Sequence, residues 1–285
     1  MAKNILVSPI VKWVGGKRQL LDDIMPLIPK HSTYVEPFVG GAAVLFELQP
    51  KKAIINDYNS ELINVYNIIK SNPEELINIL EDHKEKNSEE HFYEIRALDR
   101  DILFNELTDI EKAARIIYLN KTCYNGLYRV NLSGQFNTPY GKYKNPNIVN
   151  ASTIRAVSKY FNNNNIRIDT GDYKKALKGL RKGAFVYFDP PYVPISTSSS
   201  FTGYTEGGFS LENQEELKKQ CDKLNARGIN FLLSNSDCEF IRELYQDYKI
   251  ITVRAKRNIN RNGGSRGEIN EVLVMNYDPE ERKAR

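Results

Sequence analysis

The tetrapeptide Asp189-Pro190-Pro191-Tyr192 combines groups that could hold a planar heterocycle bearing an amino group, such as a nucleobase. The carboxylate of Asp189 can accept a hydrogen bond from the amino group. Pro190 has no N–H and a fixed φ, so that the turn presents carbonyl oxygens. Tyr192 offers a flat aromatic face. The alternative is a strand that simply ends in an Asp-Pro turn, which is common in globular chains.

The element before this tetrapeptide decides where it lies. The run over residues 184–188 is short, rich in β-branched and aromatic residues and stopped by proline, which predicts a buried parallel strand. Ligands of open α/β sheets bind outside the carboxyl ends of the strands. Asp189, which follows the run directly, is therefore expected at a binding site.

A second candidate binding segment is the loop Lys12-Trp13-Val14-Gly15-Gly16-Lys17, which holds the only tryptophan of the chain. Paired glycines let a backbone approach another group closely. Trp13 and Lys17 could supply an aromatic wall and a cation to a ligand; the alternative is a tryptophan that covers the core. The spacing of a Walker loop is absent. The apolar pattern that follows, from Leu20 to Ile28, predicts a helix.

The segment over residues 33–46 has the order strand, glycine turn, helix. Gly40 and Gly41 would let the backbone pass close beneath a cofactor, and the helix start would favour a carboxylate or phosphate. The pattern differs from G-x-G-x-x-G, so a dinucleotide is not the first choice of ligand.

Two acidic residues follow predicted strands. Asp57 comes after the strand over residues 52–55, about 20 residues beyond the glycine turn, where a carboxylate can bind ribose hydroxyls. The alternative is capping of the helix that begins near Ser60; with the glycine turn at the expected distance, we favour the ribose. Asp172 comes after the strand over residues 166–168. It could accept from an adenine amino group, with Tyr173 alongside, or cap a helix.

Residues 62–124 carry helical patterns and therefore predict an insert in the α/β sheet. The residues that follow, up to Lys144, predict a β-hairpin with its turn at Leu132 to Gly134. This hairpin contains no acid, and its cations alternate with aromatics and amides. Cations for phosphates or guanine, amides for base edges and aromatics for stacking suit a reader of a DNA groove. The alternative is a solvated hairpin.

The carboxyl-terminal part is predicted to complete the sheet. Helices over residues 151–161 and 211–227 accompany strands over residues 231–236, 250–254 and 271–277. The Ser/Thr/Gly-rich residues 196–209 are a candidate lid over the site. The loop from Arg254 to Arg266 holds five cations, and no acid occurs before Glu268, which suits phosphate contact.

Length, charge and cysteine content limit the classes of protein to which the chain can belong. The chain has 285 residues and a net charge of +4, which is too small by itself to indicate nucleic-acid binding. The widely spaced Cys123, Cys221 and Cys238 favour a reducing compartment over disulfides or a zinc site. There is no signal-peptide apolar region and no run long enough to span a bilayer. We expect a cytoplasmic protein without a metal.

Taken in order, these motifs resemble the DNA adenine methyltransferases of the Dam and Dpn type, the D12 class in the alpha group. The resemblance covers nearly the whole chain. It rests on Lys12-Trp13-x-Gly15-Gly16-Lys17, Glu36-Pro37-Phe38-x-Gly40-Gly41, Asn56-Asp57, Asn125-Gly126-Leu127-Tyr128-Arg129, Gly171-Asp172, Asp189-Pro190-Pro191-Tyr192 and Leu233-Ser234-Asn235-Ser236. Ala42 departs from the family, which usually has a third glycine in the cofactor turn.

The resemblance implies a fold and a division of the chain. The fold would be a doubly wound, mostly parallel α/β sheet of the class I S-adenosylmethionine methyltransferase type. Residues 1–61 and 147–285 would form the catalytic domain. Residues 62–146 would form an inserted DNA-recognition domain of helices and a β-hairpin.

The resemblance also implies site residues. S-adenosylmethionine would be bound by Trp13, Lys17, Glu36, Pro37, Phe38, Gly40, Asp57, Asp172 and Asp189. The target adenine would be flipped out of the duplex; Asp189 and the Pro190 carbonyl would take its two amino hydrogens, and Tyr192 would stack on it. Methyl transfer would be direct. DNA would be contacted by Tyr124, Asn125, Leu127, Arg129, Asn137, Pro139, Lys142 and Tyr143, with Arg129 on a guanine, and the implied target is GATC.

Two other classes of protein share parts of this pattern. A small-molecule or protein methyltransferase could share the cofactor half, but Asp189 and the basic hairpin favour DNA as the substrate. An inactive DNA-binding regulator could share the fold, but intact Asp189 and Asp57 favour an enzyme. The expected partner is double-stranded DNA, bound by a monomer or by a dimer formed on DNA, with or without a companion restriction enzyme.

Overall fold

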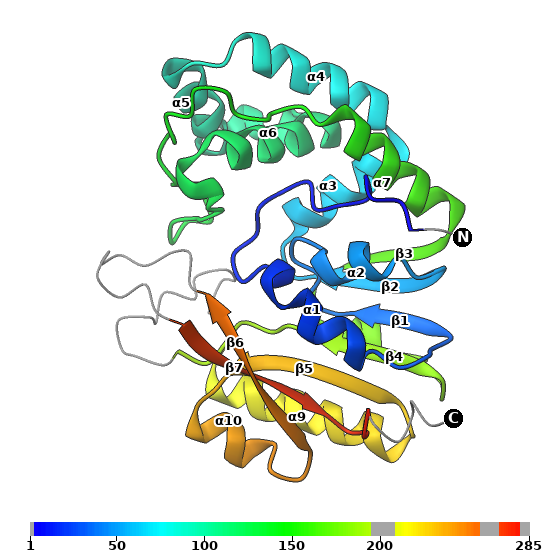
Figure 1. Cartoon of the computed structure of the whole chain (residues 1–285). Coiled ribbons are helices and arrows are strands. Elements are labelled where there is room, and N and C mark those ends of the chain that lie inside the picture. The colour runs from blue at the N-terminus through cyan, green and yellow to red at the C-terminus, as the bar shows by residue number, and fades with distance from the viewer. Residues whose placement is uncertain (1–2, 195–208, 257–267, 280–285) are drawn as a thin grey trace.

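The computed structural model of the chain describes residues 3–194, 209–256 and 268–279 (Figure 1). Two predicted features lie outside the described residues. They are the candidate lid, apart from Phe209, and the part of the basic loop between Lys256 and Glu268.

The described residues form a seven-stranded sheet in the order β3-β2-β1-β4-β5-β7-β6. The first five strands in this order are mutually parallel, and β7 is antiparallel to both β5 and β6. The strand order reverses between β1 and β4, which is where doubly wound sheets bind ligands. The strands are β1 Thr33–Glu36, β2 Lys52–Asp57, β3 Asn165–Thr170, β4 Ala184–Phe188, β5 Asn230–Ser236, β6 Lys249–Lys256 and β7 Glu268–Met275.

The central strands are buried on both faces, and their side chains alternate between two hydrophobic clusters, as strand geometry requires. Tyr187 of β4 belongs to the cluster beneath α2, α3 and α7, whereas Val186 and Phe188 belong to the cluster beneath α8, α9 and α10. The sheet is therefore covered on both faces, as the near-continuous apolar runs predict. These helices are α2 Ala43–Leu48, α3 Ser60–Ser71, α7 Ala151–Asn163, α8 Lys174–Leu177, α9 Leu211–Ala226 and α10 Glu239–Leu244.

A separate helical layer lies above the α3 and α7 side of the sheet (Figure 1). It consists of α4 Pro73–Glu85, α5 Glu89–Ala97 and α6 Asp109–Thr122, with 3₁₀ turns η3 Leu98–Arg100 and η4 Ile102–Glu106 between the last two. A capping box of Thr108 and Glu111 begins α6, because each satisfies a free backbone N–H of the other. The helical patterns over residues 62–124 are thus confirmed.

The single helix predicted after Lys17 is wrong. That segment consists of the 3₁₀ turn η1 Lys17–Leu20, the short α1 Leu21–Ile24 and the 3₁₀ turn η2 Met25–Leu27. Pro26 is at the start of η2, and its missing N–H prevents an α-helix from continuing there.

The predicted hairpin has the expected turn but not two regular strands. The N–H of Asn131 donates to Gln135 O at 2.8 Å, and the N–H of Asn137 donates to Arg129 O at 2.9 Å. Beyond these bonds the pairing is reduced to isolated bridges at Val130–Phe136 and Cys123–Tyr140. Pro139 lacks a donor for a longer ladder, and the chain before the turn starts as the 3₁₀ turn η5 Tyr124–Gly126.

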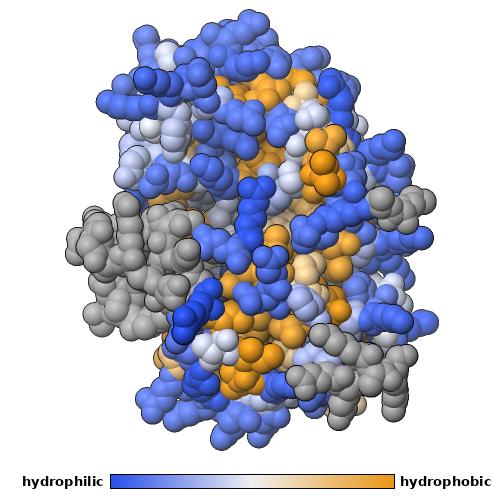
Figure 2. Space-filling view, viewed as in Figure 1, coloured by the Kyte–Doolittle hydropathy of each residue, from blue (hydrophilic) through white to orange (hydrophobic). Residues whose placement is uncertain are grey.

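The surface shows where the fold keeps its apolar residues. Hydrophilic residues cover most of the face seen in Figure 2, and hydrophobic residues emerge only in separate patches. Within the described part of the chain, none of the helices has the length and apolar character required to cross a bilayer.

Candidate active site

The carboxyl ends of neighbouring parallel strands bring three predicted site residues together. Val35 of β1 pairs with Val186 of β4, and Val186 pairs with Phe231 of β5. Asp189 follows β4, Glu36 ends β1 and Asp57 ends β2. These side chains therefore meet at one edge of the sheet, on both sides of the point where the strand order reverses.

The backbone after Asp189 is held by three polar side chains that sequence analysis did not single out for this task. Gln214 of α9 donates through Nε2 to Pro191 O at 2.8 Å. Asn235 of β5 accepts from Val193 N at 3.2 Å and donates to Gln214 Oε1 at 3.0 Å. Ser236 donates through Oγ to Val193 O at 2.7 Å. The turn after β4 is therefore rigid.

This bracing leaves one carbonyl available. The Pro191 and Val193 carbonyls accept from Gln214 and Ser236, but no described residue donates to the Pro190 carbonyl. Asp189 lies beside it, with a side chain 19% exposed. The tetrapeptide thus presents a carboxylate and a free carbonyl oxygen next to each other.

Lys17 lies directly against this pair of acceptors. Its Nζ is 2.7 Å from Asp189 Oδ1, donates to Gly15 O at 2.6 Å and lies 4.6 Å from the centre of the Tyr192 ring. Only 5% of the Lys17 side chain is exposed. The loop that contains Trp13 and Lys17 therefore supplies its cation to the Asp189 tetrapeptide.

The electrostatics of Asp189 follow from these neighbours. Burial raises the pKa of Asp189 to about 6, although the cation of Lys17 pulls it down; the carboxylates of Glu271 and Asp57 add to the rise. Without Lys17 the pKa would be higher still. Glu271, on β7, is a further residue that sequence analysis did not identify: it accepts from Tyr192 OH at 2.7 Å and so orients the ring.

The glycine turn lies against Trp13. A Cβ on Gly40, whose φ is +47°, would be 3.0 Å from Trp13 Cδ1, and one on Gly41 would be 3.3 Å from Trp13 Cβ. Glycine is therefore needed in this turn at least in part because the backbone packs closely against the indole side chain of Trp13. Ala42 adopts a φ of 58°, so the departure from glycine at this position still permits the left-handed conformation that the turn uses.

Asp57 fastens the glycine turn to β2. Its Oδ2 accepts from Gly40 N at 2.9 Å and its Oδ1 accepts from Asn59 N at 3.0 Å. The cap of α3 is Asn59, which accepts from Leu62 N. Because Asn59 caps α3, helix capping does not account for the position of the Asp57 carboxylate. Burial raises its pKa, and the backbone amides lower it.

Glu36 and Asp172 lie in contrasting surroundings. Glu36 is 2% exposed and accepts from Tyr34 OH at 2.9 Å. Burial raises the pKa of Glu36 well above its usual value, and the hydrogen bond from Tyr34 opposes the rise. Asp172 is exposed, and its Oδ1 accepts from the N–H of Lys174, the first residue of α8, at 2.8 Å; the N-cap of α8 is Tyr173, and no side chain caps it.

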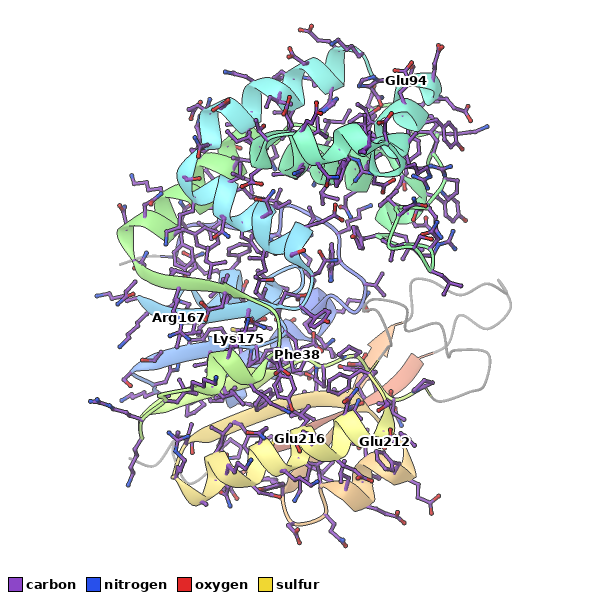
Figure 3. All side chains as sticks on the ribbon, turned by 180° about the vertical axis from the view of Figure 1, so that it is seen from behind. Phe38, Glu94, Arg167, Lys175, Glu212 and Glu216 are labelled. Atoms are coloured by element: carbon purple, nitrogen blue, oxygen red, sulfur yellow. The ribbon has the colours of Figure 1, made fainter. Side chains whose placement is uncertain are left out.

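An aromatic group lines the same edge of the sheet. Phe38 follows Pro37 in the turn after β1, and its ring stacks on Tyr173, with centroids 5.0 Å apart and planes at 27°. The edge of Phe209 meets Phe38 at 5.8 Å. Because Tyr173 follows Asp172 directly, this stack brings the turn after β1 to the loop that carries Asp172. Figure 3 labels Phe38 together with Lys175 of α8 and Glu216 of α9, two of the helices that cover this face of the sheet.

The predicted DNA-contacting residues are spread over the hairpin surface. Arg129 is exposed and is oriented by Asn137, whose Oδ1 accepts from Arg129 Nε at 2.6 Å. Lys142 Nζ lies 3.9 Å from Glu89 Oε2 of α5. The fold therefore places a carboxylate beside a cation that has no acidic neighbour in the hairpin sequence. Leu127 and Asn137 are half-buried; besides Arg129, the exposed members of the set are Tyr124, Asn125, Pro139, Lys142 and Tyr143.

Three cations beside the hairpin were not predicted as site residues. Burial lowers the pKa of Lys121 to about 8, and the charges of Lys12 and Arg18 lower it further. None of the three forms an ion pair with a residue in the described ranges. Lys12 Nζ also lies 5.9 Å from the centre of the Tyr143 ring. Lys12 is the first residue of the motif that contains Trp13, but only the folded chain brings it to Lys121.

Within the described ranges, no group of three or more His, Cys, Asp or Glu residues could hold a metal ion. Cys123, Cys221 and Cys238 are free thiols. The groups that the described residues bring to the site are carboxylates, a carbonyl oxygen, cations and aromatic rings.

With this geometry established, comparisons identify the family. Residues 13–259 match the family described as D12 class N6 adenine-specific DNA methyltransferase, and the chain belongs to that family. It is an adenine-specific DNA methyltransferase, and its mixed α/β fold with a mostly parallel sheet is consistent with a class I methyltransferase.

Three relatives match the chain over nearly its whole length. The type II methyltransferase M1.LlaDCHI of Lactococcus lactis subsp. cremoris is 48% identical, over 97% of this chain and 98% of its own. The type II methyltransferase M.MjaIII of Methanocaldococcus jannaschii is 41% identical, over 95% and 99%. The DNA adenine methylase of Escherichia coli K12 is 37% identical, over 98% and 97%.

Proposed function

We propose that the protein transfers a methyl group from S-adenosylmethionine to the exocyclic amino nitrogen of an adenine flipped out of duplex DNA. The observation that carries this proposal is the pair of acceptors after β4, the carboxylate of Asp189 and the free carbonyl of Pro190. An exocyclic amino group has two hydrogens to donate, one for each acceptor. A stacked, paired adenine could not reach this recessed site, so the base must leave the duplex.

Each residue of the tetrapeptide has a part in this chemistry. Hydrogen bonds to Asp189 and Pro190 O draw the nitrogen lone pair out of conjugation with the ring and leave it free to attack. Tyr192 stacks on the base, and its hydroxyl is held by Glu271. Lys17 keeps the Asp189 carboxylate ionised and therefore able to accept. As the nitrogen–carbon bond forms, the sulfur–carbon bond breaks and a neutral thioether leaves; the nitrogen then releases one of its two protons to solvent.

The chain offers a fitting place for the cofactor, whose sulfonium supplies an electrophilic methyl group. One buried polar atom at the end of β2, Asn56 Oδ1, has no hydrogen-bond partner in the described part. Asp57 follows it in the chain and is bonded to the glycine turn, and Phe38 and Tyr173 provide aromatic surface. We propose that these residues hold S-adenosylmethionine together with Trp13, Lys17, Glu36, Pro37, Gly40, Asp172 and Asp189.

The hairpin and the helical layer would bind the duplex. We propose that residues 62–146 form the DNA-recognition insert and that residues 1–61 and 147–285 form the catalytic domain, with α3 shared at the boundary, since Lys70 Nζ at its end donates to Ile166 O of β3. Arg129, held by Asn137, would contact a guanine. The cluster of Lys12, Arg18 and Lys121 would contact phosphates. The proposed target is GATC, methylated alone or beside a companion restriction enzyme.

The test is transfer of a labelled methyl group from S-adenosylmethionine to short duplexes. One duplex contains GATC, one carries N6-methyladenine at the same position on both strands, and one contains the four bases in scrambled order. We expect label only in the first, recovered as N6-methyladenine. Equal labelling of the scrambled duplex would contradict the proposed target, and absence of label from all three would contradict the proposed reaction.

A further inference from the structure

Tyr128 joins the DNA-reading hairpin to the glycine turn through one aromatic stack. Its ring lies against Trp13, with centroids 4.8 Å apart and planes at 24°. Trp13 also adjoins Gly40 and Gly41, which approach it so closely that an added Cβ on either would crowd its side chain. Trp13 therefore contacts both the hairpin and the glycine turn.

The glycine turn has little freedom to move independently of Trp13. Tyr66 of α3 donates through its hydroxyl to Gly40 O at 2.6 Å, and Asp57 accepts from Gly40 N at 2.9 Å. Both backbone groups of Gly40 are thus bonded to side chains of α3 and β2. A displacement of the indole would strain these bonds, because close-packed groups transmit small shifts.

The other end of Tyr128 is equally well fixed. Tyr128 is 5% exposed, and its hydroxyl donates to Glu61 Oε2 at 2.6 Å. Burial, together with the charge of Glu61, raises the pKa of Tyr128 well above its usual value, so the hydroxyl remains a donor. Glu61 belongs to the first turn of α3, the helix that also carries Tyr66.

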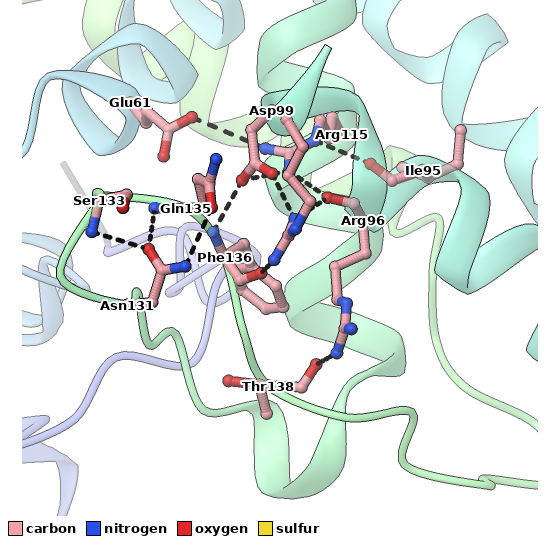
Figure 4. Close-up of polar contacts among 11 residues, drawn as sticks. Glu61, Ile95, Arg96, Asp99, Arg115, Asn131, Ser133, Gln135, Phe136 and Thr138 are labelled. Carbon is pink, nitrogen blue, oxygen red and sulfur yellow. Dashed lines mark hydrogen bonds and ion pairs between the residues drawn. The ribbon is translucent and has the colours of Figure 1, made fainter.

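The return side of the hairpin is bound to the same network (Figure 4). Arg115 of α6 is 1% exposed; its Nη1 lies 3.8 Å from Glu61 Oε1 and its Nη2 lies 2.7 Å from Asp99 Oδ2. Asp99 Oδ2 also accepts from Phe136 N at 2.7 Å, and Arg100 Nη2 donates to Phe136 O at 2.7 Å. Both sides of the hairpin are therefore connected to the residues around Trp13.

We propose that Tyr128 is a positioning residue that couples DNA binding by the hairpin to S-adenosylmethionine binding at the glycine turn, through its stack on Trp13. This inference rests on the proposed function, because it requires DNA on the hairpin and the cofactor at the turn. Coupling of this kind is reciprocal: if DNA tightens cofactor binding, the cofactor tightens DNA binding by the same factor.

The test measures that factor with S-adenosylhomocysteine, which binds as the cofactor does but cannot transfer a methyl group. Calorimetry gives its Kd with and without the GATC duplex for the wild type, Tyr128→Phe and Tyr128→Leu. Tyr160→Phe is the matched control, because it removes a buried tyrosine hydroxyl, bonded to Pro50 O, away from the hairpin. We expect DNA to tighten binding by about fivefold or more in the wild type and the control. Tyr128→Leu should bring this factor close to one, and Tyr128→Phe should retain most of it.

A second readout follows from the single tryptophan of the chain. Addition of the duplex without cofactor should change Trp13 fluorescence in the wild type and in Tyr128→Phe, but not in Tyr128→Leu. A melting curve would show whether Tyr128→Leu is destabilised. In that case Tyr128→Phe, which keeps the ring, tests the proposal: loss of coupling in this variant would contradict a role for the stack.

The inference fails if Tyr128→Leu keeps the wild-type factor, or if the wild type shows no coupling. In either case methyl transfer to GATC by the wild type would still stand, so that failure of the inference is distinguishable from failure of the proposed function. A wild type that neither binds S-adenosylhomocysteine nor methylates DNA would overturn both.

Discussion

Lys17 and Asp189 form a buried ion pair, 2.7 Å from Nζ to Oδ1, that joins two segments 172 positions apart in the sequence. One segment is the glycine-containing loop that carries Trp13, and the other is the tetrapeptide after β4. The pair places a cation beside the acceptors proposed for the adenine amino group, and most of the predictions below depend on it.

Replacement of Asp189 should remove activity without removing the cofactor. In Asp189→Asn the side chain keeps its shape, but an amide donor can replace the second acceptor oxygen and the charge is lost. We expect the single-turnover rate of methyl transfer to fall by about 10²-fold or more, the size of effect seen when one charge-stabilising group is removed from a site. Calorimetry should show S-adenosylmethionine binding within a few-fold of the wild type. A variant with nearly full activity would remove Asp189 from its proposed role.

The activity should depend on pH through Asp189. Its pKa is raised to about 6, so protonation on lowering the pH through 6 removes the acceptor and should slow transfer. Lys17 lowers this pKa, and Lys17→Met should therefore shift the midpoint of the acid limb to higher pH. Single-turnover rates between pH 5 and 8 test both statements. A shift to lower pH in the variant would contradict the assigned electrostatics.

Arg129 should determine preference for one base pair. A bidentate arginine–guanine contact discriminates by about 1–3 kcal/mol, so Arg129→Ala should methylate near-cognate sites differing at that guanine relatively better. The matched control is Lys142→Ala, which removes an exposed cation of the same hairpin and should weaken cognate and near-cognate turnover alike. Relative rates on GATC and its single-base variants provide the comparison. If Arg129→Ala slows methylation of all sites equally, the hairpin contacts the DNA backbone and does not read this base.

Lys121 should make DNA binding sensitive to alkaline pH. Its pKa is lowered to about 8, so it loses its charge as the pH rises through 8, and DNA affinity should decline between pH 7 and 9. Lys121→Arg stays charged and should flatten this decline. At pH 7, Lys121→Met should reduce the slope of log K against log salt by about 0.9, the value for one phosphate contact. Titrations of a fluorescent duplex measure both, and an unchanged slope would place Lys121 away from phosphate.

The ion pair of Arg115 and Asp99 should stabilise the helical layer. Arg115 is 1% and Asp99 10% exposed, and Arg115→Met would remove the buried partner of the carboxylate and leave it with the more exposed Arg100 alone. Breaking a buried pair in this way costs about 3–5 kcal/mol. Urea unfolding should show this loss, whereas exposed Arg155→Met, which removes a surface partner of Glu74, should have a much smaller effect, because solvent screens an exposed pair. A loss of similar size in both variants would contradict the prediction.

Much of the fold could be predicted because its signals are local. The apolar run before Asp189, the glycine turn after β1 and the apolar period of α9 each depend on neighbouring residues, and each is present. The carboxyl-edge position of Asp189, Glu36 and Asp57 also followed, since parallel strands direct their ends to one edge. The helix after Lys17 failed where Pro26 interrupts it, and the hairpin strands failed where Pro139 lacks a donor.

The partners of the site residues could not be predicted, because they come from distant elements whose approach depends on packing. Neither composition nor spacing indicates that Lys17 would pair with Asp189, that Glu271 of β7 would hold Tyr192, or that Asn235 and Gln214 would brace the turn.

The sequence by itself determined which groups the protein has for its chemistry and on which strand ends they lie. Only the tertiary structure decided which of them are charged, oriented or free to accept, because burial and opposite charges act over a few ångströms in space, whatever the separation along the chain.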